Sequence, residues 1–203
     1  MRREKLGFSL AAVFLTICFY YRGGLILLPA LLLPIAAHEL SHVLALLALG
    51  QKITSLALDV RGLCISYQGG CNSLDHILAA LAGPFGGLVY AFFTSRLALY
   101  TGCDWLEQSA WISFLLSAFN LLPIPPLDGG RVFSGLCTLA LGEEHGTRLC
   151  ERVSGVLLSL LLVSAILLMV WKKSTGLLAA SIWLLLFQNE EVPTCKVEKN
   201  IIK

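Results

Sequence analysis

The sequence predicts an all-α polytopic membrane protein with about six transmembrane helices and one short, membrane-associated β-hairpin. Two observations favour this fold class. The 203 residues are 57% hydrophobic and 14% charged, whereas a soluble domain usually carries about 25% charged residues. The apolar residues also form runs of about 20, which is long enough for a helix to cross a bilayer. We therefore expect a multi-pass integral membrane protein.

The first predicted span covers residues 6–21 and follows a basic start at residues 1–5. A secretory signal peptide would begin in the same way. However, the apolar stretch ends in two tyrosines and an arginine at residues 20–22, where a cleavage site needs small residues. We expect this span to be retained.

The second predicted span, residues 25–49, holds only three strongly polar side chains, those of His38, Glu39 and His42. An ionisable group in the middle of a membrane helix costs about 3 kcal/mol on insertion scales and usually serves a function. These three residues are therefore the first candidates for a functional site.

Residues 53–67 are expected to form the β-hairpin. They mix β-branched and alternating residues around Arg61-Gly62, a pattern typical of two strands joined by a turn. A lone hairpin is only marginally stable in water, so we expect this one to lie against the membrane domain.

Two of the later spans contain residues that break helices. The later spans are predicted at residues 76–100, 109–141, 153–171 and 176–187. The first of them contains Gly83-Pro84, and the second contains three prolines and an Asp-Gly-Gly sequence within residues 122–130. Irregular backbone at membrane depth must find hydrogen-bond partners in the protein or in a wet cavity. The pattern therefore predicts a water-accessible interior.

Basic residues predict the orientation of the spans. An even number of spans puts both termini on one side, and that side carries ten Lys and Arg residues against four on the other, with Arg131 inside a span. The positive-inside bias then places the termini in the cytoplasm. No polar stretch is long enough for a separate soluble core, so residues 1–203 are expected to form a single membrane domain. The seven cysteines are scattered and contain no C-x-x-C pair, which argues against a cysteine zinc cluster.

The sequence His38-Glu39-Leu40-Ser41-His42 is an H-E-x-x-H pattern inside a helical run. Residues four apart on a helix face the same way, about 6 Å apart along the axis, so both imidazoles can reach one tetrahedral metal ion. Glu39 is offset by about 100° and would lie beside the metal, placed to bind its water molecule.

Two histidines need a further ligand, and Asp128 is the best candidate. It is the only carboxylate in the proline-broken segment, and the two glycines after it let the backbone turn. Alternatively, Asp128 could cap a helix that starts at Arg131. The competing ligands are His76 and His145, which both lie near predicted span ends and are expected at a surface or interface.

These residues resemble the site-2 protease family of intramembrane zinc metalloproteases. The resemblance rests on His38-Glu39-x-x-His42 and on Asn120-x-x-Pro123-x-Pro125-x-x-Asp128-Gly129, with Gly83-Pro84 as a weaker third feature. It covers residues 25 to about 135, which correspond to the catalytic core of the family, while residues 153–187 would add C-terminal helices. The compact six-span form is most similar to the bacterial branch that includes the protease processing a sporulation sigma-factor precursor.

The resemblance implies one Zn²⁺ per chain, held by His38, His42 and Asp128, with Glu39 as the catalytic acid/base. It also implies an active site facing the cytoplasm, in the cell membrane of a bacterium. The expected partners are the lipid bilayer and a membrane-protein substrate with a transmembrane segment. The resemblance also allows a regulatory membrane partner, and no nucleic acid is expected. Asn120 has an amide that can donate and accept hydrogen bonds, so it is a candidate for binding the substrate backbone.

The sequence also allows two other interpretations. Broken helices with intramembrane His and Asp also suit a transporter or channel with a metal site at mid-membrane, although no inverted repeat is visible. An inactive zinc-binding homologue that binds membrane proteins would share the same ligands, and only the presence of Glu39 argues against it. Arg131 could either stabilise a developing oxyanion or serve as an ordinary charge partner.

Overall fold

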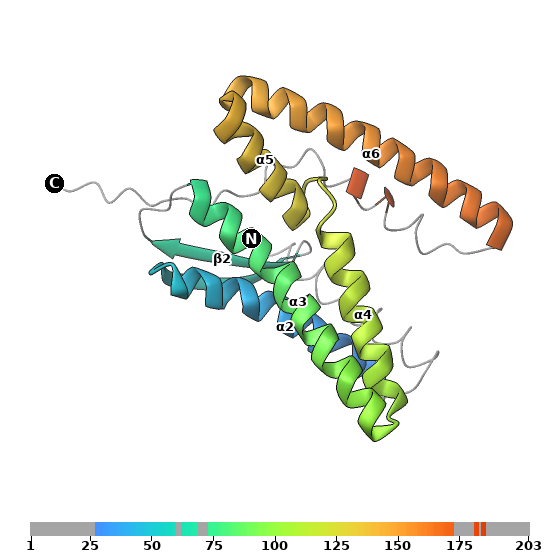
Figure 1. Ribbon diagram of the computed structural model, residues 1–203. Coiled ribbons are helices and arrows are strands. Elements are labelled where there is room, and N and C mark those ends of the chain that lie inside the picture. The colour runs from blue at the N-terminus through green and yellow to red at the C-terminus, as the bar shows by residue number, and fades with distance from the viewer. Residues whose placement is uncertain (1–26, 60–61, 69–72, 173–180, 183, 186–203) are drawn as a thin grey trace, which may run out of the picture. The chain divides into compact units, whose positions relative to one another are not determined.

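The computed structural model describes residues 27–59, 62–68, 73–172, 181–182 and 184–185, which are mostly helical (Figure 1). The elements in this part of the chain are α2 (Leu27–Ala48), β1 (Lys52–Asp59), β2 (Gly62–Gln68), α3 (Ser73–Thr101), α4 (Asp104–Asn120), α5 (Asp128–Leu141) and α6 (Glu143–Lys172). The expected first span at 6–21 lies outside the described residues. So does most of the expected last span, of which only residues 181–182 and 184–185 are described, as helix.

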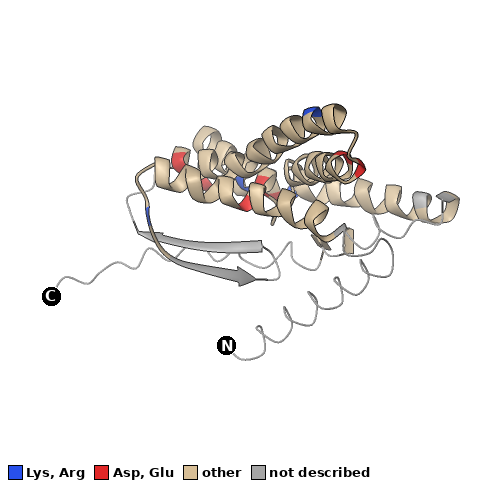
Figure 2. Ribbon diagram, turned by 90° about the horizontal axis from the view of Figure 1, so that it is seen from below, with Lys and Arg blue, Asp and Glu red and all other residues tan. Residues whose placement is uncertain are grey.

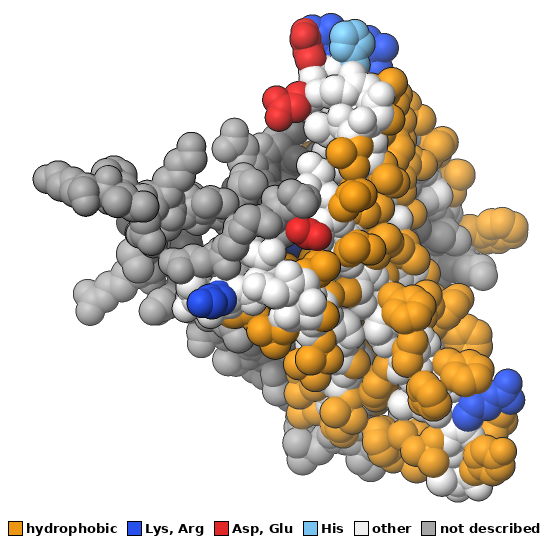
Figure 3. Space-filling model, turned by 60° about the vertical axis from the view of Figure 1, so that its left-hand side comes forward, with side chains coloured by type: hydrophobic (Ala, Val, Ile, Leu, Met, Phe, Trp, Pro, Cys, Tyr) orange, Lys and Arg blue, Asp and Glu red, His pale blue; other side chains and the backbone are white. Residues whose placement is uncertain are grey.

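Three of the described helices are long and apolar enough to cross a membrane: Leu28–Ala48, Ser73–Thr101 and Glu143–Trp171. Charged residues are sparse along the helical ribbon (Figure 2); α2, for example, contains only Glu39 as a charged side chain. Hydrophobic side chains cover much of the face in Figure 3, and large ones such as Phe93 and Trp111 are more than half exposed. Apolar surface on this scale suits contact with lipid, and the chain is an integral membrane protein.

The range 109–141, expected as one interrupted span, is divided into α4 and α5 by residues 121–127. Three prolines in this short connection remove backbone donors and prevent a continuous helix. The expected break at Gly83-Pro84 is wrong, because α3 continues through Pro84. Pro84 is among the fully buried side chains of the described residues. Packing around one proline can offset the single hydrogen bond that it removes from a helix.

The strands β1 and β2 are antiparallel and pair from Lys52 with Gln68 to Asp59 with Gly62, with one register irregularity near Ile53. They occupy the region in which the hairpin was expected. Between α2 and β1, Gly50 has a φ of 75°, a conformation that glycine adopts without steric cost and that often ends a helix. The association of these strands with the membrane stays a prediction.

The described residues fall into two compact units. The first contains α2, both strands, residues 82–101 of α3 and nearly all of α4. The second contains residues 73–81 and everything described from Phe119 onward, including the neighbouring helices α5 and α6 (Figure 1). Its buried core is formed by Ile124, Leu127, Leu158 and Leu184.

Candidate metal centre

Helix α2 places the two predicted histidine ligands side by side. Their Nε2 atoms are 3.3 Å apart, and the ring planes meet at 81° with centroids separated by 4.9 Å. His38 is buried and His42 is partly buried. The pair follows directly from helical geometry, because residues four apart stand one above the other on a helix.

The spacing of the two nitrogens fits a shared zinc ion. Tetrahedral zinc with Zn–N distances of about 2.0–2.1 Å places two ligand nitrogens about 3.3–3.4 Å apart. The observed separation is 3.3 Å. When no metal is bound, one imidazole protonated at Nε2 can donate a hydrogen bond across the same gap. The geometry therefore suits either a proton or a metal ion between the rings.

Helix α3 approaches the histidine helix so closely that glycine is required at two positions. A side chain at Gly83 would overlap the His42 imidazole, and a side chain at Gly86 would overlap the Ser41 hydroxyl. That hydroxyl donates a hydrogen bond to the Ala37 carbonyl at 2.7 Å. No side chain of α3 therefore intervenes at these points, and the imidazole of His42 rests against backbone.

Three serines of α4, Ser109, Ser113 and Ser117, are fully buried at intervals of four residues. Ser113 donates a hydrogen bond to the Gly87 carbonyl at 2.7 Å, and the hydroxyls of Ser109 and Tyr90 are 2.9 Å apart. Small hydroxyl residues let membrane helices pack closely and hydrogen-bond to each other. The interval of four residues is readable in the sequence, but the sequence does not show that these hydroxyls face α3.

Asp128 is the first residue of α5 and is buried. It follows residues 121–127, whose position is fixed by the core of the second unit through Ile124 and Leu127. The Pro123 carbonyl of this loop accepts a hydrogen bond from Ser154 of α6 at 3.1 Å. A carboxylate at a helix N-terminus is also stabilised by the helix dipole.

Gly129 and Gly130 allow the first turn of α5 to pack closely against the preceding loop, residues 121–127. A Cβ at Gly130 would lie 2.5 Å from the Pro125 nitrogen and 2.6 Å from the Ile124 carbonyl carbon. A Cβ at Gly129 would overlap the backbone of residues 121–122. Because α5 starts at Asp128, the alternative in which Asp128 precedes a helix beginning at Arg131 does not fit. Arg131 lies one turn further along α5, with Nη1 3.7 Å from Oδ1 of Asp128.

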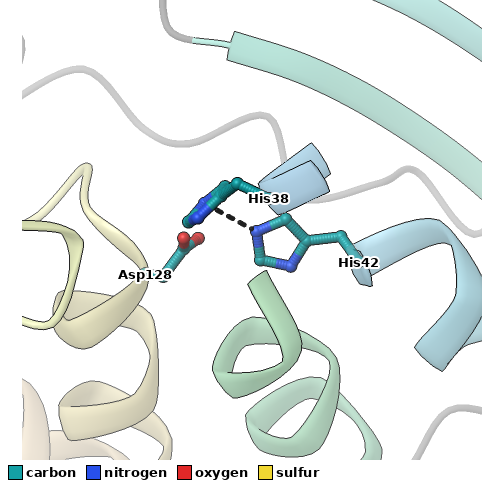
Figure 4. A group of neighbouring side chains, drawn as sticks. All are labelled: His38, His42 and Asp128. Carbon is teal, nitrogen blue, oxygen red and sulfur yellow. Dashed lines mark hydrogen bonds between the residues drawn. The ribbon is translucent and has the colours of Figure 1, made fainter. Parts of the chain in front are cut away.

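Among the described residues, His38, His42 and Asp128 form a group that could hold a metal ion: one ligand atom from each lies within 4.8 Å of the others (Figure 4). Two imidazoles and a carboxylate are common zinc ligands, and three protein ligands leave a fourth position for water. The competing histidines, His76 and His145, are both exposed and lie outside this group.

The two other predicted site residues lie close to these ligands in the sequence. Glu39 follows His38 in α2 and is partly buried. Asn120 is the last residue of α4 and is also partly buried. Their functional roles, like those of the three ligands, stay predictions.

Comparison with known proteins relates the chain to a group of metalloproteases. Residues 78–164 match the family model described as "Peptidase family M50"; this range includes Asn120 and Asp128 but not His38. The chain is 31% identical over 137 residues to "Putative zinc metalloprotease sll0528" of Synechocystis sp., covering 64% of this chain and 36% of that protein. It is 32% identical over 140 residues to "Putative zinc metalloprotease Rip3" of Mycobacterium tuberculosis, covering 61% and 32%. The chain thus spans about a third of the length of these curated relatives.

A solved structure shares the fold. The chain superimposes on "Site-2 Protease from Methanocaldococcus jannaschii" with a TM-score of 0.69 and 19% sequence identity, over 98% of this chain and 93% of that one. At this level of identity the likeness concerns the fold.

Proposed function

We propose that this chain, which is related to peptidase family M50 and shares the fold of a site-2 protease, is an intramembrane zinc metalloprotease. It would cleave peptide bonds in or near transmembrane segments of its substrates. The single observation that carries the proposal is the group formed by His38, His42 and Asp128. Two imidazoles from α2 and a carboxylate from α5 form a ligand set typical of zinc. They belong to a chain with helices long and apolar enough to cross a membrane.

The three ligands would hold one zinc ion per chain and leave one position open. Zinc bound there would polarise the scissile carbonyl and lower the pKa of a water molecule to roughly 7. Glu39 would accept a proton from the attacking water and then deliver it to the leaving amide nitrogen. Its place next to His38 supports this role, because the side chain diverges from the His38 imidazole by about 100° around the helix.

A transmembrane substrate hides its backbone hydrogen bonds inside a helix, so it must unwind before its carbonyl can react. Strands β1 and β2 offer an edge to which an extended segment could add. The Asn120 amide can both donate to and accept from a peptide group. We assign these elements to holding the opened substrate strand, with the active site and both termini on the cytoplasmic side of a bacterial cell membrane.

The decisive experiment compares the wild-type protein with Glu39→Gln after purification in detergent. Zinc content is measured first, and each protein is then incubated with a single-span membrane substrate. We expect about one zinc ion per chain in both proteins and cleavage products only with wild type. Glutamine keeps the shape and polarity of the side chain but cannot take up the proton.

The same experiment separates the alternatives. Zinc binding without any cleavage by wild type would favour an inactive homologue that binds membrane proteins. Wild type that moves zinc across proteoliposome membranes and cleaves nothing would favour a transporter. Normal cleavage by Glu39→Gln would remove the proposed role of Glu39.

Asn120→Ala tests the assignment to the substrate. We expect slower cleavage with unchanged zinc content, because the amide is assigned to the substrate strand and not to the metal. Loss of zinc in parallel with activity would instead make Asn120 a support of the metal ligands.

A further inference from the structure

Gly83 of α3 lies directly against the imidazole of His42. A Cβ built at Gly83 would overlap the ring, with Nε2, Cε1 and Cδ2 as its three nearest atoms. Both residues belong to the first compact unit. The added Cβ would therefore overlap one edge of the imidazole ring itself.

The overlapped edge is the one that matters for metal binding. Nε2 of His42 is the atom that lies 3.3 Å from Nε2 of His38. A methyl group at position 83 would occupy the place of that nitrogen, so the ring would have to rotate about its side-chain bonds. Rotamers on a helix are restricted by the preceding turn, and the alternatives would move Nε2 away from its partner. A ring displaced in this way no longer offers the nitrogen spacing that suits tetrahedral zinc.

We propose that Gly83 is a positioning residue for the zinc ligand His42. By having no side chain, it leaves the space in which the imidazole presents Nε2 toward His38. This inference rests on the proposed metal site, but it assigns to Gly83 a role beyond the close packing of two helices. Gly83 does not touch the metal and acts only through the orientation of the ring.

The neighbouring glycine Gly86 provides a matched control. It lies one turn further along the same helix and also packs on α2, but its missing side chain faces the Ser41 hydroxyl. Ser41 is not a metal ligand, and its hydroxyl bonds to the Ala37 carbonyl. Gly83→Ala and Gly86→Ala are therefore the same substitution in the same helix. The first faces the proposed metal ligand His42, and the second faces Ser41, which is not one of the proposed ligands. Alanine is a better helix former than glycine, so the propensity of α3 does not weaken in either variant.

Metal binding gives the first test. The full-length variants are purified in detergent, stripped of metal and titrated with zinc against a competing chelator, and Co²⁺ is used as a spectroscopic probe of the ligands. We expect Gly83→Ala to weaken zinc binding at least tenfold and to change the visible Co²⁺ spectrum. We expect Gly86→Ala to stay within about threefold of wild type, with an unchanged spectrum. An equal loss of zinc affinity in both variants would mean that Gly83 serves only general helix packing. Wild-type zinc affinity in Gly83→Ala would refute the proposal.

A second test needs no metal and no activity. The thermal midpoint of the metal-free protein is measured for wild type, Gly83→Ala, His42→Ala and the double variant. His42→Ala removes the ring, so the methyl group of Gly83→Ala gains space to occupy. We expect Gly83→Ala to lower the midpoint in the wild-type background and to leave it unchanged or raise it in the His42→Ala background. An equal decrease in both backgrounds would show that Gly83 and His42 are not coupled.

The two tests separate the failure of this inference from the failure of the proposed function. If wild type binds no zinc, the metal site is lost as a proposal, but the metal-free cycle still measures the contact between Gly83 and His42. If wild type binds zinc and the cycle shows no coupling, the metal site stands and the positioning role falls.

Discussion

The two regions that supply the candidate metal ligands are built in different ways. The histidine pair lies on one regular helix, and the spacing of four residues alone brings Nε2 of His38 within 3.3 Å of Nε2 of His42. Asp128 stands where an irregular loop becomes a helix, and nothing in its local sequence spacing fixes its position. That position depends on the buried Ile124 and on the Ser154 hydrogen bond to the loop.

The two regions are therefore sensitive to different substitutions. The spacing of the imidazoles depends on local helix geometry and on the room left by its neighbours. The carboxylate depends on tertiary contacts with residues that are distant in sequence, so a change far from the site can move it. Substitutions near the histidines should therefore act through sterics on the rings, whereas substitutions in the second unit should act through the loop.

Removal of one candidate ligand from either region should change zinc binding most. His38→Ala and Asp128→Ala should each weaken zinc binding by more than about 100-fold, because even the loss of residues that only support metal ligands costs 10–100-fold. Both variants should also lose peptide cleavage. Zinc affinity measured by chelator competition checks this. Wild-type affinity in Asp128→Ala would mean that the histidine helix holds the metal without the carboxylate.

The next largest effect is expected at Gly130, where α5 meets its own loop. Gly130→Ala places a methyl group 2.5–2.8 Å from backbone atoms of Ile124 and Pro125, which cannot rotate away. We expect a destabilisation of about 3 kcal/mol or more, near the upper end for overpacking, together with weaker zinc binding as the loop moves Asp128.

Gly135→Ala is the control within the same helix. Its methyl group would lie 2.7 Å from a side-chain carbon of Ile77, and a flexible side chain can shift. We expect a destabilisation of about 1 kcal/mol or less and unchanged zinc affinity. Thermal unfolding and metal titration measure both quantities. Similar losses in the two variants would show that the loop contact has no special weight.

The sequence predicted the helical character from composition, and the spacing of four residues predicted that the two histidines face the same way. It also singled out Asp128 as a carboxylate among helix breakers, and one ligand atom of Asp128 lies within 4.8 Å of those of the histidines; its role as a third ligand stays a prediction. The sequence also predicted strands near residues 53–67, where β1 and β2 occur. The helix break expected at Pro84 is wrong. Whether a proline ends a helix depends on the packing around it, and Pro84 is fully buried within a continuous α3.

Long-range contacts could not be predicted. The sequence shows Gly83 and Gly86 as small residues suited to close packing, but it cannot say that one faces His42 and the other Ser41. Those pairings depend on the rotation and depth of α3 against α2, which several weak contacts determine together. For the same reason, the sequence could not predict the hydrogen bond from Ser154 to Pro123, whose partners are 31 residues apart.

A smaller pair of effects compares one buried serine from each unit. Ser113 donates to the Gly87 carbonyl, and Ser154 donates to the Pro123 carbonyl. Replacing either by alanine removes one buried hydrogen bond and should cost about 1 kcal/mol of stability. Only Ser154→Ala should also weaken zinc binding, by about threefold, since only Pro123 belongs to the loop that carries Asp128. Equal zinc affinities in the two variants would mean that this hydrogen bond does not help to fix the loop.

The smallest effect is expected at Arg131, and it decides between the two roles open to this residue. Its side chain is half exposed, and Nη1 lies 3.7 Å from the Asp128 carboxylate, which is longer than a good hydrogen bond. Such pairs contribute about 0.5 kcal/mol or less, so Arg131→Ala should keep zinc affinity within about twofold and cleavage within about threefold. An arginine that stabilised a developing oxyanion would behave differently: its removal would lower kcat by about 10²–10³ while zinc affinity stayed constant. Measured kcat and zinc affinity therefore separate the roles. A large loss confined to kcat would move Arg131 from the support of Asp128 into the catalytic machinery.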